Sequence, residues 1–288
     1  MPPRRLLRPR PDRIAGIALV AVLGLISLLI VLSLGVLDAT RRHGQMSRRS
    51  MEAAQAREFA DSALRLAMLE WSTARSSADI EVLGPKQIEL FGTTANVILE
   101  LESGRIDLNA ADELLLTAAF AGNGYEASEA RQLAARILDW RDADDVTNIN
   151  GGAERSEYRL AGKERGPRNA PFESVRELQG VWGLESIQPE LLDAFTVYTH
   201  AADPKSGTTT PAVENALGWA DRERLGGRRW LTESHETPDL TATLAGEVAR
   251  LHACTEMNSL HVCRRAIVRF TGNAGAPWLV FVWESVAR

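Results

Sequence analysis

The chain of 288 residues has few cysteines, no excess of basic charge and no recognisable catalytic motif. Its two cysteines, Cys254 and Cys263, are too few for a disulfide framework but can form one bridge in an oxidising compartment. The net charge of -5 gives no overall basic face for a nucleic-acid backbone. Because G-x-S-x-G, Walker, HExxH and Cys/His catalytic patterns are also missing, we predict a protein that is not an enzyme and has no catalytic residues.

An uncharged segment lies near the amino terminus, from Ile14 to Leu37. At about 1.5 Å per residue, a helix of this length crosses a hydrocarbon core of about 30 Å. Arginines before the segment favour a cytoplasmic amino terminus, although Arg41 and Arg42 follow closely and weaken this signal. The segment is longer than the apolar part of a secretory signal and lacks a small-x-small cleavage site. We therefore predict a single-pass membrane helix.

The next segments combine helical and strand patterns. Apolar residues recur every three or four positions between Ala53 and Trp71, which predicts an amphipathic helix that continues the membrane helix if Gly44 does not interrupt it. Residues 87–109 alternate between apolar and polar side chains around a turn at Glu102-Ser103-Gly104. This alternation predicts a hairpin or meander.

The remaining chain reads as a helical unit followed by strands. Asn109 is a candidate N-cap, with Asp112 and Glu113 in the first helical turn. A second helix is predicted over 126–140, and two further short helices are predicted in 170–183 and 185–195. After a linker at 201–211, the segments HVCRRAIVRF and PWLVFVWESV predict two strands. The sequence thus predicts an α+β protein in which a helical unit is inserted among strands.

The amino-terminal pattern resembles that of type IV pilins and pseudopilins. A basic leader ends at Gly16, an apolar helix begins at Ile17, and an amphipathic helix follows. The resemblance implies cleavage between these two residues by prepilin peptidase and methylation of the new amino terminus. Most such proteins carry Glu at the fifth mature position, where this chain has Ala21. A carboxylate in lipid is retained mainly where it has a partner, so its loss suits a subunit at a filament tip, which lacks one neighbour.

Four motifs narrow the resemblance to one subfamily. The segments GRIDLNAADELLL, ILDWRDADD, GGAERSEY and RNAPFESVREL follow in the order that is typical of K-type minor pseudopilins of type II secretion. The chain departs from the pattern near Thr208–Leu231, where a second Asn-rich helix start is missing. The resemblance implies a pilin-like fold: a long transmembrane and amphipathic helix packed on a small antiparallel sheet, with a large helical insertion similar to SAM or helix-hairpin-helix domains.

The resemblance also implies a domain order and a role. We expect a leader (1–16), a transmembrane helix (17–37), an amphipathic helix with the first strands (38–108), a helical insertion (109–200), and a linker with the last strands (201–288). The protein would be anchored in the bacterial inner membrane with its carboxy-terminal domain in the periplasm. It would join I- and J-type minor pseudopilins, with the H-type as a further candidate, in a tip complex that initiates or caps the pseudopilus and supports export of folded proteins.

A DNA-binding role is the alternative function. The segments LNAADELL and RELQGVWGL also resemble helix-hairpin-helix modules, as in membrane-anchored competence proteins that bind DNA. Such hairpins offer backbone amides and basic side chains to phosphates. However, the segment from Asp139 to Glu157 contains six acidic residues and only two arginines. This charge should repel DNA, so we expect no nucleic-acid partner.

The acidic segment ILDWRDADDVTNINGGAERSEY is a candidate calcium site. Clustered carboxylates without nearby His or Cys suit a hard cation such as calcium. The segment is not an EF-hand, because Thr147 occupies the position where Gly is required. Charge alone favours a solvated acidic loop, whereas the resemblance to a family whose helical domain binds calcium implies a structural ion. The candidate ligands are Asp142, Asp144, Asp145, Glu154 and Glu157.

The two cysteines lie in a repeated pattern, LHACTEMNSLHVC, in which His252 and Cys254 recur as His261 and Cys263. Side chains two residues apart on a strand share a face, so a zinc site with two Cys and two His is geometrically conceivable. A disulfide between Cys254 and Cys263 is the favoured alternative in an oxidising periplasm.

Overall fold

The computed structural model describes residues 13–73, 85–90, 92–205, 208–223 and 244–286, with side chains described from residue 20 onward except for 36–40. Residues 1–12 of the predicted leader and the side chains of Gly16 and Ile17 lie outside the described residues. The chain divides into two compact units, Met1–Ala56 and Arg57–Arg288. Each unit is described here by itself.

The first unit consists of helix. Helix α1 (Arg13–Thr73) runs through Gly44 without a break, as the apolar and amphipathic patterns predicted. Leu23, Leu25 and Leu28 are among its exposed apolar side chains. Among the described residues, no helix has an apolar run long enough to cross a membrane. The membrane helix predicted over 17–37 includes side chains that are not described, and it stays a prediction.

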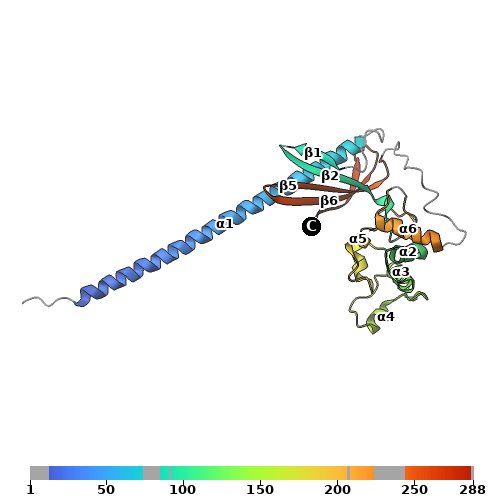
Figure 1. Ribbon diagram of the computed structural model, residues 1–288, viewed down its shortest axis with the longest axis horizontal. Helices are drawn as coiled ribbons and strands as arrows, with labels where there is room; N and C mark the ends of the chain where they lie inside the picture. Colours follow the sequence, from blue (N-terminus) through green and yellow to red (C-terminus); the bar gives the residue numbers. More distant parts are fainter. Residues whose placement is uncertain (1–12, 74–84, 91, 206–207, 224–243, 287–288) are drawn as a thin grey trace, which may run out of the picture. The chain divides into compact units, whose positions relative to one another are not determined.

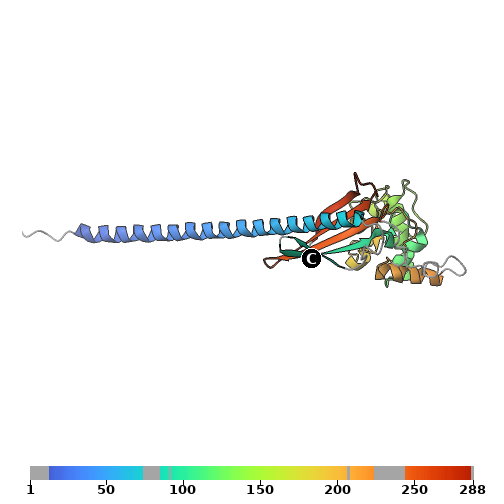
Figure 2. The same cartoon turned by 90° about the horizontal axis from the view of Figure 1, so that it is seen from above.

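The second unit contains a five-stranded antiparallel sheet in the order β1-β2-β5-β6-β7 (Figures 1 and 2). The two predicted last strands and a hairpin within 87–109 are confirmed, but the hairpin turns between β1 and β2, whereas Glu102–Gly104 forms the 3-10 helix η2. All helices after α1 lie in sequence between β2 and β5, which are neighbours in the sheet. The strands are β1 (Lys86–Leu90), β2 (Thr93–Leu101), β5 (Val248–Met257), β6 (Leu260–Phe270) and β7 (Trp278–Val286).

The carboxy-terminal part of α1 covers one face of this sheet. Alternate residues of β2 are buried, because side chains along a strand point to opposite faces and only one face meets the helix. Leu64 and Met68 of α1 are fully buried against Val97 and Leu251 of the sheet. This layer is the first of two hydrophobic cores in the unit.

The helical insertion has its own core, in which Phe120, Leu133, Tyr158 and Phe195 are buried. Two short parallel strands, β3 and β4, pair where the chain enters and leaves this region. Its elements are η2 (Glu102–Gly104), β3 (Ile106–Asp107), α2 (Glu113–Ala121), α3 (Ala127–Arg141), α4 (Arg155–Leu160), η3 (Val175–Gly180), α5 (Pro189–Leu192), β4 (Phe195–Thr196) and α6 (Pro211–Glu223).

The structure corrects two details of the predicted helices. The N-cap of α2 is Asp112, whose carboxylate accepts from the Leu115 N–H at 2.8 Å. Asn109 is not the cap, because its amide exchanges hydrogen bonds of 2.9 and 2.8 Å with the backbone of Phe172. The insertion also extends beyond residue 200, since α6 buries apolar side chains in the insertion core and packs on α2.

Buried ion pairs connect the insertion with the sheet. Glu102 is fully buried and accepts from Arg250 Nε of β5 at 2.6 Å. Asp193, which follows α5, pairs with Arg250 and with Arg105. Arg105 is itself buried and also pairs with Glu100 of β2 at 2.6 Å. The protein's own arginines therefore neutralise the carboxylates at this junction.

Candidate functional site

Three carboxylates meet where α3 ends and α4 begins. Oxygen atoms of Asp139, Asp142 and Glu154 lie within 4.8 Å of one another. Asp139 and Asp142 lie three residues apart at the end of α3, and so share one side of that helix. The Gly151-Gly152 turn brings Glu154 back to them, as the sequence indicated. Asp139 and Glu154 are each only 1% exposed.

The loop between the two helices is built closely around Asp139. The backbone N–H of Asn148 donates to both carboxylate oxygens of Asp139, at 3.2 and 3.1 Å. A Cβ at position 152 would lie 2.1 Å from Asp139 Oδ2, so only glycine leaves room for the carboxylate there. Gly151 has a φ of +92°, which is another reason for glycine in this turn.

The electrostatics of this cluster are unfavourable without a cation. Burial, together with the negative charges of Asp139 and Asp142, raises the pKa of Glu154 to about 7. Burial also raises the pKa of Asp139 and of Asp142 above their ordinary values. The nearest arginine in sequence, Arg141, offsets only part of this charge: it attracts the Asp142 carboxylate, but its guanidinium donates to the backbone carbonyls of Leu108 and Ala111.

Unpaired oxygens in the cluster fit a metal ion. Apart from a capping contact with the Glu157 N–H at the start of α4, neither carboxylate oxygen of Glu154 has a hydrogen-bond partner among the described residues, and Asp142 Oδ1 has none either. Buried polar atoms are nearly always paired, so such atoms call for an explanation. Three carboxylates and no nitrogen or sulfur ligands match the preference of a hard cation such as calcium.

The structure groups the predicted ligands differently from the sequence. Asp142 and Glu154 lie in the cluster, whereas three others have hydrogen-bonding roles in the surrounding turns. Asp144 accepts from the Val146 N–H, and Asp145 accepts from the Asn169 amide. Glu157 accepts from the Glu154 N–H at 2.9 Å, as part of the α4 N-terminus. Asp139 was not among the predicted ligands, although its spacing from Asp142 at the end of a helix could have identified it.

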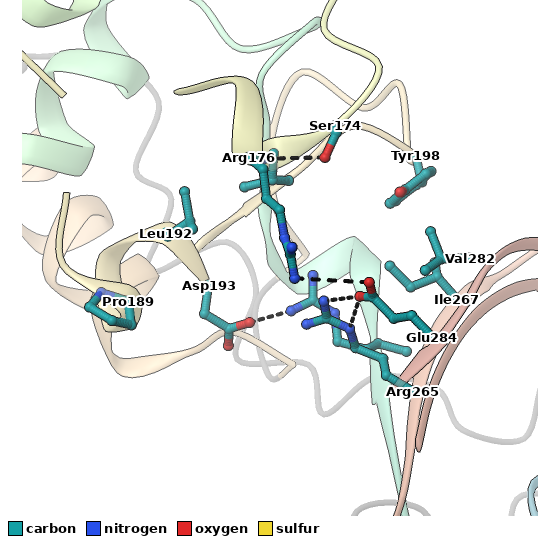
Figure 3. A pocket seen from close by; sticks show the side chains of 12 residues that line it. Ser174, Arg176, Pro189, Leu192, Asp193, Tyr198, Arg265, Ile267, Val282 and Glu284 are labelled. Carbon is teal, nitrogen blue, oxygen red and sulfur yellow. Dashed lines mark hydrogen bonds and ion pairs between the residues drawn. The ribbon is translucent and has the colours of Figure 1, made fainter. Parts of the chain in front are cut away.

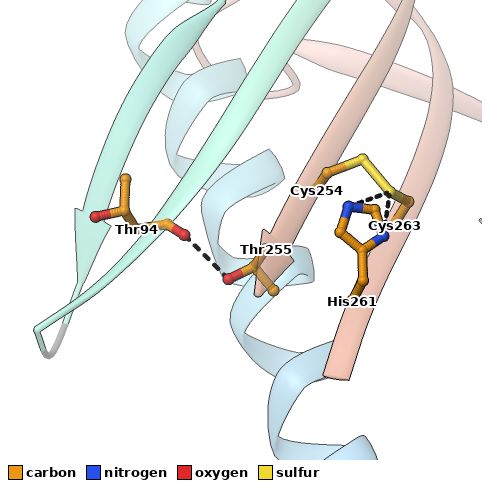
Figure 4. The surroundings of a disulfide bond; sticks show 5 residues. All are labelled: Thr94, Cys254, Thr255, His261 and Cys263. Carbon is orange, nitrogen blue, oxygen red and sulfur yellow. Dashed lines mark hydrogen bonds between the residues drawn. A yellow bond between two sulfur atoms is a disulfide. The ribbon is translucent and has the colours of Figure 1, made fainter. Parts of the chain in front are cut away.

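Cys254 and Cys263 form a disulfide across β5 and β6 (Figure 4). The two residues are direct register partners in this strand pair. A ring nitrogen of His261 lies 3.8 Å from Cys263 Sγ, whereas His252 lies opposite Arg265. Zinc would need two free thiolates at this place, and the sulfurs are bonded to each other instead.

A cavity of about 340 Å³ lies between the sheet and the insertion (Figure 3). Its charged side chains are paired with one another: Glu284 with Arg265, and Asp193 with Arg250. Ser174, the one serine of the lining, accepts from the Arg176 N–H at the start of η3. The lining contains no histidine or cysteine, so this serine has no base beside it to activate it as a nucleophile.

A helix packed on an antiparallel sheet, with a separate helical insertion between adjacent strands, defines an α+β protein. Residues 98–200 match the family model of the type II secretion system (T2SS), protein K. This match contains all four motifs that indicated the K-type subfamily, and it confirms that resemblance.

The fold agrees with this assignment. The chain is similar to a chain of the crystal structure of the GspK-GspI-GspJ complex from the enterotoxigenic Escherichia coli type 2 secretion system, with a TM-score of 0.61 and 17% sequence identity. The alignment covers 84% of this chain and 99% of that chain. No curated protein matches the chain in sequence.

Proposed function

We propose that this protein is a tip subunit of the type II secretion pseudopilus, which joins I- and J-type minor pseudopilins and initiates or caps the filament. The protein K match over residues 98–200 carries this proposal. The similarity to a chain of a GspK-GspI-GspJ complex supports the choice of partners. A structural role also suits the cavity described above, which offers no activated nucleophile.

Two features of the chain support a place at the tip. Ala21 stands where most pilin-like proteins have a glutamate for the neighbouring subunit, so this subunit needs no such neighbour. The insertion also adds a complete second core between β2 and β5. Such a head would obstruct a further subunit stacked above it.

Membrane anchoring and processing belong to the same proposal. The uncharged run from Ile14 to Leu37 supports a membrane anchor. The proposed processing is cleavage after Gly16 and methylation of Ile17. Mass spectrometry of the membrane fraction should find a chain that begins at Ile17. An intact Met1, or a start beyond Thr40, would contradict this processing.

The proposed role of the acidic cluster is to hold a structural calcium ion. Asp139, Asp142 and Glu154 would supply carboxylate oxygens, and bound calcium would supply the positive charge that the cluster lacks. The chain contributes a turn of two glycines, buried positions for Asp139 and Glu154, and a half-buried position for Asp142. The ion would thus fix the loop between α3 and α4.

The test of the proposed function is assembly. The full chain, purified in detergent with the I- and J-type pseudopilins encoded beside it, should form a complex of defined mass by light scattering. Deletion of the chain should also reduce pseudopilus formation and secretion. Absence of any complex, or recovery of this chain along the whole filament shaft, would contradict the proposal. Binding of DNA at low salt would instead favour the competence-type alternative.

A further inference from the structure

The two edge strands of the sheet differ in how they present their backbone. Within the part of the chain that the structure describes, strands β1 and β7 each have one neighbour in the sheet, β2 and β6 respectively. An edge strand leaves a row of backbone N–H and C=O groups unpaired, and proteins normally protect such edges with charges, short strands or proline.

Strand β1 has these protections. It is short, and Lys86, Gln87 and Glu89 are three of its residues. Lys86 also pairs with Glu70 of α1, which holds a charge beside this edge. A further strand that added here would have to displace or bury these polar side chains, which is costly.

Strand β7 has fewer of these protections: its one charged residue is Glu284, and a bulge interrupts its pairing with β6 between Val280 and Val282. It runs from Trp278 to Val286, and WLVFVW contains no charged residue and no proline. Leu279, Val280 and Phe281 are 54%, 47% and 43% exposed, so apolar side chains reach solvent in consecutive positions. Consecutive residues on a strand point to opposite faces of the sheet, so apolar side chains are exposed on both faces here. Such exposure is expected at an edge to which another strand is added.

A positive charge lies beside this apolar edge. The Arg269 guanidinium lies 5.5 Å from the centre of the Phe281 ring and donates to the Tyr198 carbonyl at 3.1 Å. Phe281 in turn stacks on Tyr198. Arg269 Nε has no hydrogen-bond partner among the described residues. This Nε is itself buried, so an incoming carboxylate would be attracted by the positive charge of the guanidinium rather than by this donor.

We propose that β7 is a docking edge for an extended strand of a partner pseudopilin, with apolar side chains and a carboxylate that pairs with Arg269. The unpaired backbone of β7 requires an extended peptide, because only a strand supplies matching donors and acceptors along its length. The carboxylate follows from charge complementarity with Arg269. This inference rests on the proposed function, since it assigns a surface to the proposed partners.

A second copy of this chain fits the edge less well. The one acidic residue of β7 is Glu284, and it pairs with Arg265 at the cavity shown in Figure 3. An antiparallel β7–β7 pair would therefore bring no free carboxylate to either Arg269. A different chain meets the requirements of this edge better.

The test uses the full chain in detergent with the purified I- and J-type pseudopilins as probes. Leu279→Lys and Val280→Lys each place a charge on an exposed side chain of the edge, so neither change disturbs the core. We expect each to weaken binding of one of the two probes at least about tenfold, because an added strand would bury an unpaired charge. Gln87→Lys, an equal change of charge at the β1 edge, should leave the affinity unchanged.

The outcomes separate this inference from the proposed function. If the unaltered chain binds neither probe, the proposed function fails. If it binds and both β7 variants bind equally well, the docking edge is wrong. An Arg269→Gln variant checks the proposed pairing between Arg269 and a carboxylate of the partner. It should weaken binding of the same probe and reduce the salt dependence of its affinity. Self-association of the unaltered chain that Leu279→Lys abolishes would show that the occupant is a second copy, which also overturns the proposal.

Discussion

Two buried glutamates in the same compact unit have opposite surroundings. Glu102, at the junction of the sheet and the insertion, is fully buried and is paired with Arg250. Glu154, in the insertion, is 1% exposed, and its neighbours are Asp139 and Asp142. The first carboxylate is neutralised by the protein itself, whereas the second lies among like charges.

The comparison shows what a buried carboxylate requires. Burial removes water from both groups, so each needs a positive charge or a proton. At Glu102 the positive charge is covalently part of the chain and is present at all times. At Glu154 it has to come from solution, as a proton or as a metal ion, and stability should then depend on pH and on calcium.

Removal of Arg250, the arginine that pairs with the buried Glu102, should have the largest effect on stability. Arg250→Ala leaves Glu102 buried without its main partner, and loss of one member of a buried pair costs about 3–5 kcal/mol. The free energy of unfolding, measured by urea denaturation of the full chain in detergent, should fall by this amount with or without calcium. Arg176→Ala is the control, because that side chain is 71% exposed and lies 3.9 Å from Glu284. An equal loss in both variants would contradict the comparison.

Stability without calcium should depend on pH through Glu154. Its pKa rises from 4.5 to about 7 in the folded protein, so folding favours the neutral form. Stability from this group is therefore full below its ordinary pKa and is lost as pH rises through about 7. The loss should approach about 3 kcal/mol. Urea denaturation in chelator across this range measures it. Glu154→Gln should remove most of the dependence of the unfolding free energy on pH. If the substitution leaves this dependence intact, other titrating groups cause it.

Gly152→Ala should disturb the cluster without changing its charge. The new Cβ would lie 2.1 Å from Asp139 Oδ2, so the carboxylate or the turn has to move. Overpacking of this kind costs about 1–3 kcal/mol, and calcium should also bind more weakly. Gly275→Ala is the matched control, because its Cβ would meet no atom closer than 3.5 Å. Unchanged calcium affinity in Gly152→Ala would place the ion elsewhere.

The smallest effect is expected for Glu157→Gln. Its carboxylate accepts from the Glu154 N–H at the start of α4, so the substitution weakens a helix N-terminus by about 0.5–1 kcal/mol. The rise in melting temperature on calcium addition should persist, since this side chain lies outside the three-carboxylate cluster. If this variant no longer responds to calcium, Glu157 is a calcium ligand after all.

Most of the fold could be predicted from local patterns. The alternation in β2 and the spacing in α3 report burial on one face, and both elements lie where these patterns placed them. Helix α6 was missed although the sequence carried its signal: its buried residues Val213, Ala216, Leu217 and Ala220 recur at helical spacing. Asn109 was misassigned as a cap because its partner, the Phe172 backbone, lies 63 residues away.

The site could be predicted in composition but not in geometry. The sequence indicated an acidic cluster that includes Asp142 and Glu154, and the structure brings these two carboxylates together with Asp139. It could not distinguish ligands from turn-forming residues, because Asp144 and Asp145 differ from Asp142 only in which backbone or side-chain donors they meet. Similarly, the exposure of β7 depends on the strand order, which alternation alone does not reveal.

Calcium addition to the full chain, and to its Glu154→Gln variant, tests the central claim most directly. In chelator the variant should melt at a higher temperature than the unaltered protein, because a neutral amide replaces a buried charge among carboxylates. Calcium should raise the melting temperature of the unaltered protein and leave that of the variant nearly unchanged, while magnesium should have a smaller effect because it retains its water more strongly. Equal melting temperatures with and without calcium in the unaltered protein would show that the cluster does not take up the ion, and would contradict the account.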